Sequence, residues 1–594
     1  MCETTSRPLM PNLLALSFEG RVAPSFDLKC LAEGRDRPDG WGLGYYPSGE
    51  PSVTVLKEPA PSATSIRSEL VRAWEHTASS IFVLHIRHAR WGSNTSANTQ
   101  PFARHHGGQE WLFGHSGSLE HRLEGPKDIP FEPVGSTDTE RLFCELLERM
   151  AKHGCRRIAD VDPDLLASWY RELNKLGSLS SVLTDGQDLC VWADERGVTL
   201  PHVASFYPPY ERAAFGDDDV ELDLTKRGAM SRRGVIITSN PLRVYGDGRV
   251  EHHQVEPGQL ILVRGGVVRH KTRGPESAAG LPQSGSLPVV PVGSRPQLPP
   301  EGEARYRIRH RTVYRYAKAV ERSKHVLRLE PVHDRGQHVE RFELRVSVPH
   351  TGFDFEDVFG NRTRRLLIHT AYNELSIESE SVALVRAVDL SFSRRHVRSS
   401  IPLVWMPWQR HMLAPYLLPP ELFESELTEL TEYAMNFVRR NDSDLIDTLM
   451  DINQTIYREY KYEQGSTTLV TTPFDVYAHR KGVCQDFANL FICLARLLSV
   501  PARYVCGYVH VGGNGGDRQA MALASHAWVE VFLPDVGWRG FDPTNGTLAQ
   551  TEHVRVAVGR TYRDATPTSG TIFVGGGDET LDVAVSVERL PDDG

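Results

Sequence analysis

The chain has 594 residues and a formal net charge of -9. A single hydrophobic core rarely organises a chain of this length, so we expect two to four domains. The acidic balance argues against a nucleic-acid partner, because a phosphate backbone requires a basic surface. No apolar run of about 18 residues occurs, and the N-terminus lacks the pattern of a signal peptide, so we expect a cytoplasmic protein that does not enter a membrane.

The N-terminal half mixes predicted strands with a predicted helix. Residues 81–91 and 234–242 are short apolar segments typical of strands. Residues 137–154 have helical periodicity, and Thr137 and Glu140 have the spacing of a capping box, which places Asp138 in the first turn. The apolar residues of this helix fall on one face and are expected to be buried: Leu142, Phe143, Leu146, Leu147 and Met150.

Residues 272–303 are rich in Pro, Gly and Ser and have linker composition. Beyond them, residues 306–320 and 338–348 alternate with the period of strands, and residues 357–369 supply a turn between extended pieces. A helical region begins at residue 423. We therefore expect four parts: residues 1–271, the linker at 272–303, a β-rich domain at 304–395, and a catalytic domain at 396–594.

Cys2 directly follows the initiator methionine. A small residue at this position permits removal of Met1, after which Cys2 would carry both a thiol and a free α-amine. An α-amine titrates near pH 8, so it could take the thiol proton and return it to a leaving amine. The dipeptide alone also arises by chance, so the prediction depends on other segments.

Four later segments accompany Cys2, at residues 39–46, 85–102, 113–119 and 135–140. Together they resemble the class II glutamine amidotransferases, whose glutaminase domain is an αββα sandwich of the N-terminal-nucleophile (Ntn) hydrolase type. The resemblance spans about residues 1–265. It implies that glutamine is the substrate and that two charged side chains bind its α-carboxylate and its α-ammonium group. Arg87 would bind the α-carboxylate as a bidentate pair and Asp138 the α-ammonium, and Trp41 and Gly42 belong to the substrate-binding segment.

Each of these charges also has an ordinary interpretation. Arg87 could form a surface ion pair, and Asp138 could simply complement a helix N-terminus. One position departs from the family pattern, since the chain reads His115-Ser116-Gly117 where the family typically has His-Asn-Gly. The family uses that Asn amide and the Gly N–H to stabilise an oxyanion. Loss of one such donor costs on the order of 100-fold to 1000-fold in rate, so Ser116 marks a slow, altered or inactive site.

The second candidate nucleophile is Cys484. It precedes apolar residues with helical spacing, so it is expected at a helix N-terminus, where the dipole and unpaired N–H groups favour the thiolate. His526 follows on an alternating strand, and Asp542 stands before Pro543. Alone, His526 could be a structural histidine and Asp542 a turn cap. The order Cys, His, Asp indicates a triad in which His526 activates the thiol and Asp542 orients the imidazole.

This order resembles the bacterial transglutaminase-like superfamily, which has a papain-like α+β fold. Residues 305–316, 327–331 and 359–362 resemble the β-rich companion domain of that superfamily, and residues 559–570 resemble a segment near its end. The resemblance covers about residues 304–580. It implies thioester chemistry on a peptide or other amide, but members act as proteases, amidases, deamidases or transamidases, so the reaction stays open.

We therefore expect a multidomain α+β protein that is a bifunctional thiol enzyme with a glutaminase site and an amide-cleaving or transamidating site. The eight cysteines lack the spacing of a zinc site or a disulfide framework, so no metal or cofactor is expected. No phosphate-binding loop occurs, and the resemblance implies an ATP-grasp ligase as a partner for any synthetase step. Two alternatives are an inactive glutamine-binding regulatory module fused to a cysteine peptidase, and a non-catalytic scaffold.

Overall fold

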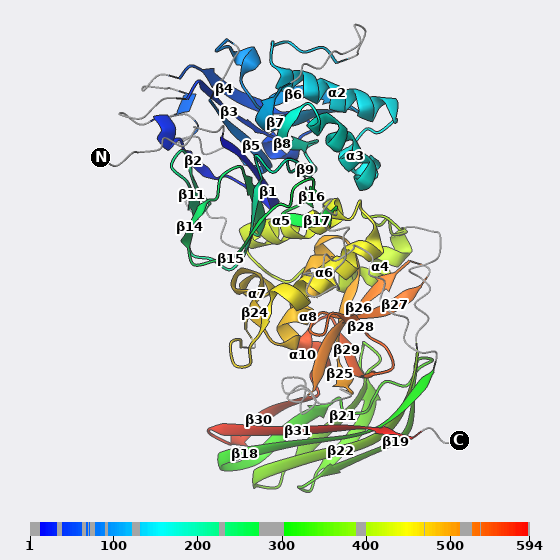
Figure 1. Cartoon of the computed structure of the whole chain (residues 1–594). Helices are drawn as coiled ribbons and strands as arrows, with labels where there is room; N and C mark the ends of the chain where they lie inside the picture. The colour runs from blue at the N-terminus through cyan, green and yellow to red at the C-terminus, as the bar shows by residue number, and fades with distance from the viewer. Residues whose placement is uncertain are drawn as a thin grey trace. The chain divides into compact units, whose positions relative to one another are not determined.

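The computed structural model describes residues 12–31, 38–61, 67–68, 71, 78–88, 93–120, 131–224, 232–272, 302–387, 399–468, 470–510, 525–534 and 536–591. The chain divides into two compact units, residues 1–294 and 295–594 (Figure 1). The fold class expected from the sequence, a multidomain α+β protein, is confirmed. Among the described helices, none is long and apolar enough to cross a membrane.

The described part of the first unit contains three sheets. The seven-stranded sheet has the order β15 (Arg249–Gln254), β10 (His202–Tyr207), β13 (Gly234–Thr238), β1 (Asn12–Val22), β5 (Ser79–Arg87), β3 (Gly40–Tyr45), β4 (Thr54–Pro59). The six-stranded sheet has the order β17 (Val267–Lys271), β16 (Leu260–Arg264), β9 (Asp188–Trp192), β8 (Gly177–Thr184), β7 (Gln109–Leu119), β6 (Phe102–His106). The four-stranded sheet has the order β14 (Arg243–Gly246), β11 (Ala213–Gly216), β12 (Glu221–Asp223), β2 (Ser25–Asp27).

The layers follow from the two apolar faces of each large sheet. Side chains of β1, such as Leu13 and Ala15, meet side chains of β8 and β9, such as Val182 and Val191, between the two sheets. The other face of the six-stranded sheet is covered by α2 (Asp138–Lys152) and α3 (Pro163–Asn174) (Figure 1). The other face of the seven-stranded sheet packs against the four-stranded sheet and the helical residue Val71.

The α2 helix begins at Asp138, and its predicted apolar face is buried. The predicted capping box is wrong. The Thr137 hydroxyl makes no hydrogen bond among the described residues, and the Glu140 carboxylate instead accepts the backbone N–H groups of Val134 and Gly135 and pairs with Arg104. Glu140 therefore fixes the loop before the helix rather than the helix cap.

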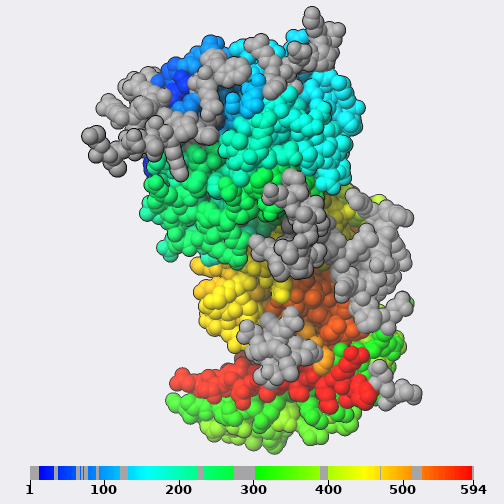
Figure 2. Space-filling view, viewed as in Figure 1, coloured from blue at the N-terminus to red at the C-terminus, as the bar shows by residue number. Residues whose placement is uncertain are grey.

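The second unit begins with a β-rich sheet. Its path is β19 (Gln337–Val346), β22 (Tyr372–Arg386), β18 (Glu303–Leu327), β21 (Arg362–Ile368), β20 (Thr351–Glu356). Two strands from the end of the chain, β30 (Thr568–Gly575) and β31 (Glu579–Leu590), also pair with β18. They lie against this sheet as the red band of Figure 2. Residues 568–590, which the sequence placed with the catalytic domain, therefore complete the β-rich sheet.

The solvent face of this sheet carries rows of opposite charges. Arg309 pairs with Glu380, Arg311 with Glu378, and Arg315 with Glu374, each across neighbouring strands. Exposed pairs of this kind contribute little stability individually.

Between β22 and β30 lies an α+β body. Its sheet has the order β28 (Thr547–Leu548), β27 (Gly537–Asp542), β26 (His526–Leu533), β25 (Ala502–Val509), β29 (His553–Gly559). Two short parallel strands pair, β23 (Lys461–Tyr462) and β24 (Lys481–Gly482). The helices are α4 (Pro407–Leu417), α5 (Glu424–Arg440), α6 (Leu445–Glu459), α7 (Pro473–His479), α8 (Cys484–Leu497) and α10 (Tyr562–Ala565). The apolar face of α8 is buried in the core of this body, as its periodicity predicted.

Candidate active sites

Cys484 is the first residue of α8, as predicted. The preceding residue Val483 donates its N–H to the Asp486 carboxylate, which also accepts the Thr467 hydroxyl. These bonds fix the chain at the point where it enters the helix. The first N–H groups of a helix have no partner within the helix and carry the positive end of its dipole, so the thiol lies where a thiolate is favoured.

Cys484 differs from the other described cysteines. The remaining six are buried, whereas Cys484 is partly exposed, and all seven are free thiols. Burial raises the pKa of Cys493 and Cys506 to about 12. Those thiols therefore stay protonated at neutral pH, and Cys484 is the described cysteine that a substrate can reach.

His526 joins Cys484 to Asp542. The His526 Nε2 and the Asp542 Oδ2 are 2.9 Å apart, and the ring is also hydrogen-bonded to the Cys484 side chain. Because Nε2 faces the carboxylate, Nδ1 is the ring nitrogen that serves the thiol. Burial alone would lower the pKa of His526, but the charge and hydrogen bond of Asp542, and then those of Cys484, raise it to about 10. An imidazolium beside the thiol is the partner that a thiolate requires.

Asp542 is fully buried and accepts five hydrogen bonds. Its Oδ1 accepts the backbone N–H groups of Thr544 and Asn545 at 3.0 and 3.2 Å. Its Oδ2 accepts the Asn545 side chain at 2.7 Å and His553 Nε2 at 3.1 Å, in addition to His526. Burial favours the neutral acid, but the charge of His526 and the hydrogen bonds of both histidines outweigh it and hold the pKa of Asp542 far below its ordinary value.

The sequence did not reveal His553 or Asn545 as members of this site. Asn545 follows Asp542 in a turn, and the segment Asp-Pro-Thr-Asn could have suggested a side chain folding back on the carboxylate. His553 begins β29, which is two strands away from His526 in the sheet. No local spacing relates it to the triad.

Trp528 packs on both histidines. Its ring lies 6.0 Å from that of His526 with 26° between the planes, and 5.2 Å from that of His553 at 74°. A stacked indole favours a protonated imidazole through the ring quadrupole. The indole also requires Gly507, because a Cβ at that position would meet the Trp528 ring and the Val554 carbonyl.

Tyr462 and Arg480 support the strand pair before the nucleophile. Tyr462 pairs with Gly482, and burial together with the charge of Cys484 raises the pKa of Tyr462 to about 12, so its hydroxyl stays protonated at neutral pH. The buried Arg480 donates to the hydroxyls of Tyr433 and Tyr460 at 2.9 and 2.8 Å, and its carbonyl accepts the Lys461 N–H. Arg480 thereby ties β23 to β24.

In the first unit, the structure holds Arg87 at the end of β5. Arg87 is 7% exposed, and its guanidinium donates to Asn94 Oδ1 at 3.0 Å and to the Ser93 carbonyl at 3.3 Å. Burial lowers the pKa of Arg87 and the nearby Asp39 raises it, with a net decrease. The surroundings of this buried guanidinium thus include Asn94, Ser93 and the carboxylate of Asp39.

Hydrogen bonds connect Arg87 with the loop that carries Asp138. Asn98 donates to the Ser93 carbonyl and accepts the backbone N–H of Ser136 at 2.8 Å. Asp138 is partly buried as the first residue of α2. The two charges that the sequence assigned to an amino-acid ligand are therefore joined through one short loop, residues 93–98.

His115 connects the same helix start with Ser116 and Gly117 on β7. Its Nδ1 is 3.1 Å from the Thr139 hydroxyl, and its Nε2 is 3.2 Å from the Ser178 carbonyl. Burial lowers the pKa of His115 to about 4, so the ring is neutral. The backbone of His115 is bracketed by Gln100, which accepts its N–H and donates to its carbonyl.

Two glycines allow these close approaches. Gly117 has a φ of +151°, and a Cβ there would meet the Ser178 carbonyl. A Cβ at Gly42 would meet the Gln100 carbonyl, so Gly42 lets the Gln100 segment approach β3. The Trp41 side chain packs in the core, and its indole donates to Glu58 at 2.9 Å. Cys2 lies outside the described residues.

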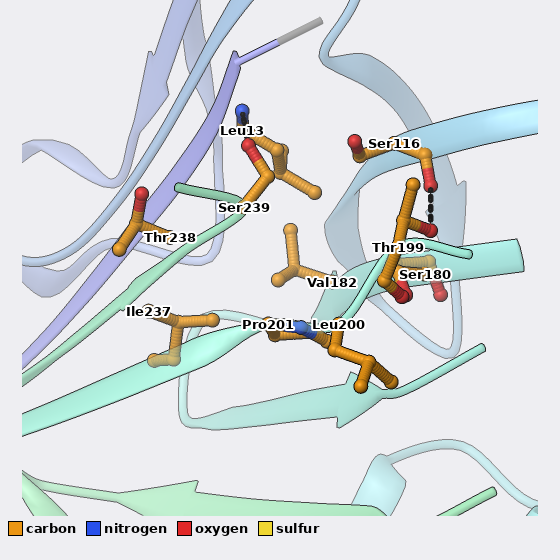
Figure 3. Close-up of a pocket in the computed structure, with 11 residues that line it drawn as sticks. Leu13, Ser116, Ser180, Val182, Thr199, Leu200, Pro201, Ile237, Thr238 and Ser239 are labelled. Atoms are coloured by element: carbon orange, nitrogen blue, oxygen red, sulfur yellow. Dashed lines mark hydrogen bonds between the residues drawn. The ribbon is translucent and has the colours of Figure 1, made fainter. Parts of the chain in front are cut away.

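A small pocket lies beside Ser116, between β1 and β13 on one side and β7 and β8 on the other (Figure 3). Leu13, Val182 and Ile237 contribute apolar walls, and Thr199 donates its hydroxyl to the Ser116 carbonyl at 3.2 Å. The pocket has about 10 Å³ of free volume, which is room for about one water molecule. This free volume is too small for an amino acid.

Family comparisons match three segments of the chain. The family model "Glutamine amidotransferases class-II" matches residues 10–286, and therefore begins after Cys2. "Bacterial transglutaminase-like N-terminal region" matches residues 306–383, and "Transglutaminase-like superfamily" matches residues 431–543, which include Cys484, His526 and Asp542.

Among the described residues, no group of His, Cys, Asp and Glu is arranged to hold a metal ion.

Individual relatives match about half of the chain or less. An uncharacterized protein from Mycobacterium tuberculosis (strain ATCC 25618 / H37Rv) is 32% identical over 308 residues, which is 49% of this chain and 94% of that protein. "Putative glutamine amidotransferase YafJ" from Escherichia coli (strain K12) is 30% identical over 38% of this chain and 84% of that protein. A solved structure titled a "Putative Cysteine Protease" from Cytophaga hutchinsonii is 23% identical, with 49% of this chain and 93% of that chain covered and a TM-score of 0.41.

Proposed function

This chain belongs to the class II glutamine amidotransferases through its N-terminal half and to the transglutaminase-like superfamily through its C-terminal half, and from this membership we propose that it is a bifunctional thiol enzyme. Cys484 cleaves or exchanges an amide or isopeptide bond through a thioester. Cys2 hydrolyses the side-chain amide of glutamine. The observation that carries the proposal is the buried His526–Asp542 pair hydrogen-bonded to a thiol at the start of α8.

At the C-terminal site, the Cys484 thiolate attacks the amide carbonyl carbon, and the carbonyl electron pair moves to oxygen. The Tyr462 hydroxyl and the first N–H groups of α8 are donors available to that oxyanion. When the tetrahedral intermediate collapses, the C–N bond breaks and the His526 imidazolium gives its Nδ1 proton to the leaving amine. A thioester on Cys484 and a neutral His526 remain.

The second half-reaction reverses these roles. Neutral His526 takes a proton from the incoming nucleophile, which attacks the thioester carbonyl, and the Cys484 thiolate leaves beside the restored imidazolium. Water as the nucleophile gives hydrolysis and an amine gives transamidation. Asp542 stays ionised throughout, because its five hydrogen bonds favour the anion.

At the N-terminal site, the α-amine of Cys2, after removal of Met1, takes the thiol proton, and the sulfur attacks the glutamine amide. Ammonia leaves with that proton, and water hydrolyses the γ-glutamyl thioester to glutamate. Arg87 and Asp138 hold the two charges of the free amino acid, with Gly42 and the Trp41 segment forming the adjoining wall. Gly117 and Ser116 face the oxyanion, with Ser116 the weaker donor.

The setting of the two reactions is also proposed. The seven described cysteines are free thiols, which supports a reducing compartment such as the cytoplasm. A synthetase step that used the released ammonia would require ATP, and an ATP-grasp ligase partner stays a prediction.

The direct test replaces each nucleophile separately. Cys484→Ala should abolish amide cleavage and leave ammonia release from glutamine unchanged, and Cys2→Ala should do the reverse. Ammonia release at the wild-type rate from Cys2→Ala protein would refute the glutaminase proposal.

Ser116 favours a second candidate for the first unit, a glutamine-binding regulatory module without turnover. Isothermal titration separates the two candidates. Glutamine binding that depends on Arg87 but yields no ammonia would support the module.

A further inference from the structure

The proposed chemistry at Cys484 needs a carboxylate that keeps His526 in one orientation, and a second histidine contacts that carboxylate. His553 is 6% exposed, and its Nε2 lies 3.1 Å from Asp542 Oδ2, the same oxygen that His526 contacts at 2.9 Å. The two histidines lie on strands β26 and β29, which flank β25 in the sheet.

The protonation of His553 follows from its other nitrogen. The backbone N–H of Gln550 donates to His553 Nδ1 at 3.3 Å. The backbone N–H of His553 in turn donates to the Gln550 carbonyl at 3.0 Å. A nitrogen that accepts a hydrogen bond carries no proton. His553 is therefore a neutral ring whose proton lies on Nε2, and it donates to Asp542 without adding a second positive charge.

We infer that His553 is a positioning residue for the proposed thiol chemistry, a fixed neutral donor that holds the Asp542 carboxylate toward His526. The inference rests on the function proposed for Cys484. Oδ1 of Asp542 is held by backbone N–H groups, whereas Oδ2, the oxygen that orients His526, is held by two side chains, Asn545 and His553. Trp528 packs edge-on against His553 at 5.2 Å and keeps the ring in place.

Neutrality of His553 has a specific consequence. A cationic partner would compete with the His526 imidazolium for the same carboxylate, whereas a neutral donor orients the carboxylate and leaves its charge to His526. The ionisable side chains that hydrogen-bond to Asp542 among the described residues are His526 and His553, and Cys484 lies beyond His526.

The test measures alkylation of Cys484 by iodoacetamide between pH 5 and pH 9, read by peptide mass spectrometry, in full-length protein. His553→Leu removes the donor, His553→Met does so with a flexible side chain that fills an irregular site, and His553→Gln keeps a donor. At pH 6, loss of one hydrogen bond to a charged group should slow Cys484 alkylation about tenfold to 100-fold in the Leu and Met variants. The Gln variant should stay within about threefold of wild type.

The outcomes separate the inference from the proposed function. Wild-type rates in whichever apolar variant folds would overturn the inference, and so would equal slowing in the Gln variant, because the shape of the ring rather than its proton would then matter. If wild-type Cys484 reacts at pH 6 no faster than in the urea-denatured chain, the proposed function itself fails. Fast wild-type reaction together with slow reaction in the apolar variants alone supports both.

Discussion

Replacing Asp542 with Asn tests the electrostatics of the triad. The pKa of His526 rises from the ordinary 6.5 to about 10, which corresponds to roughly 5 kcal/mol of interaction favouring the protonated ring. Asp542 and Cys484 share this interaction. If Asp542 supplies only half, its loss is worth roughly 2 to 3 kcal/mol, or nearly two orders of magnitude in the ratio of the thiolate–imidazolium pair to the neutral thiol–imidazole pair.

The assay is again alkylation of Cys484 as a function of pH. In wild type, the thiolate–imidazolium pair should keep the rate high at pH 6, and the rate in Asp542→Asn should fall by about 50-fold to 100-fold there. In the variant, the rate should rise only near pH 8.5, where an unassisted thiol ionises. Asp354→Asn is the control, because Asp354 is an exposed carboxylate paired with Arg364 on the β-rich sheet.

The sign of the effect on stability follows from the same pKa. The folded-state pKa of His526 lies above its unfolded value, so its contribution to the free energy of unfolding is fully present below about pH 6.5 and is lost as the pH rises through about 10. The stability difference between wild type and Asp542→Asn should shrink over that window in urea titrations. Identical alkylation profiles for wild type and Asp542→Asn would refute the reasoning.

Further predictions concern single positions. Ser116→Asn should restore the missing oxyanion donor and raise the rate of ammonia release from glutamine by up to about 100-fold, and an unchanged rate measured by a coupled ammonia assay would show that Ser116 does not limit the first site. Gly507→Ala should lower the free energy of unfolding by about 1 to 3 kcal/mol, because the new Cβ meets Trp528 and a carbonyl. Gly336→Ala, whose Cβ would make only ordinary contacts with the Arg555 and Asp334 side chains, should change it by less than about 0.5 kcal/mol. Arg480→Met should cost about 3 kcal/mol or more in urea denaturation, since it removes the Arg480 partner of the partly buried Glu459 and takes a cation from among three tyrosine rings. A stability equal to wild type would contradict the role assigned to Arg480.

The elements that depend on local pattern were predictable. Short apolar segments identified β5 and β13, and alternation identified β18 and β19. Helical periodicity identified α2, α5 and α8 together with the position of Cys484 at the start of α8. These features follow from spacing within a short window, because burial of one face is decided by which neighbours in sequence are apolar.

The features that depend on distant chain segments were not predictable. Residues 568–590 return to pair with β18, and nothing in their alternation distinguishes that partner from the sheet of the α+β body. Likewise, the contact of His553 with Asp542 depends on the strand order of the sheet, in which β26 and β25 lie between β27 and β29. The capping-box spacing at Thr137 was misleading for the same reason, since Glu140 found nonlocal partners in Arg104 and the preceding loop.

The central claim is that Cys484 takes an acyl group from nitrogen with His526 as its acid and base. The most direct measurement is mass spectrometry of the protein after acid quench during turnover of an activated amide such as a peptide p-nitroanilide. We predict an acyl group on the peptide that contains Cys484 in wild type, more of it in His526→Gln when a p-nitrophenyl ester replaces the amide, and none in Cys484→Ser. Turnover of the amide by wild type with no acyl group on Cys484, or unchanged turnover by Cys484→Ser, would contradict the claim.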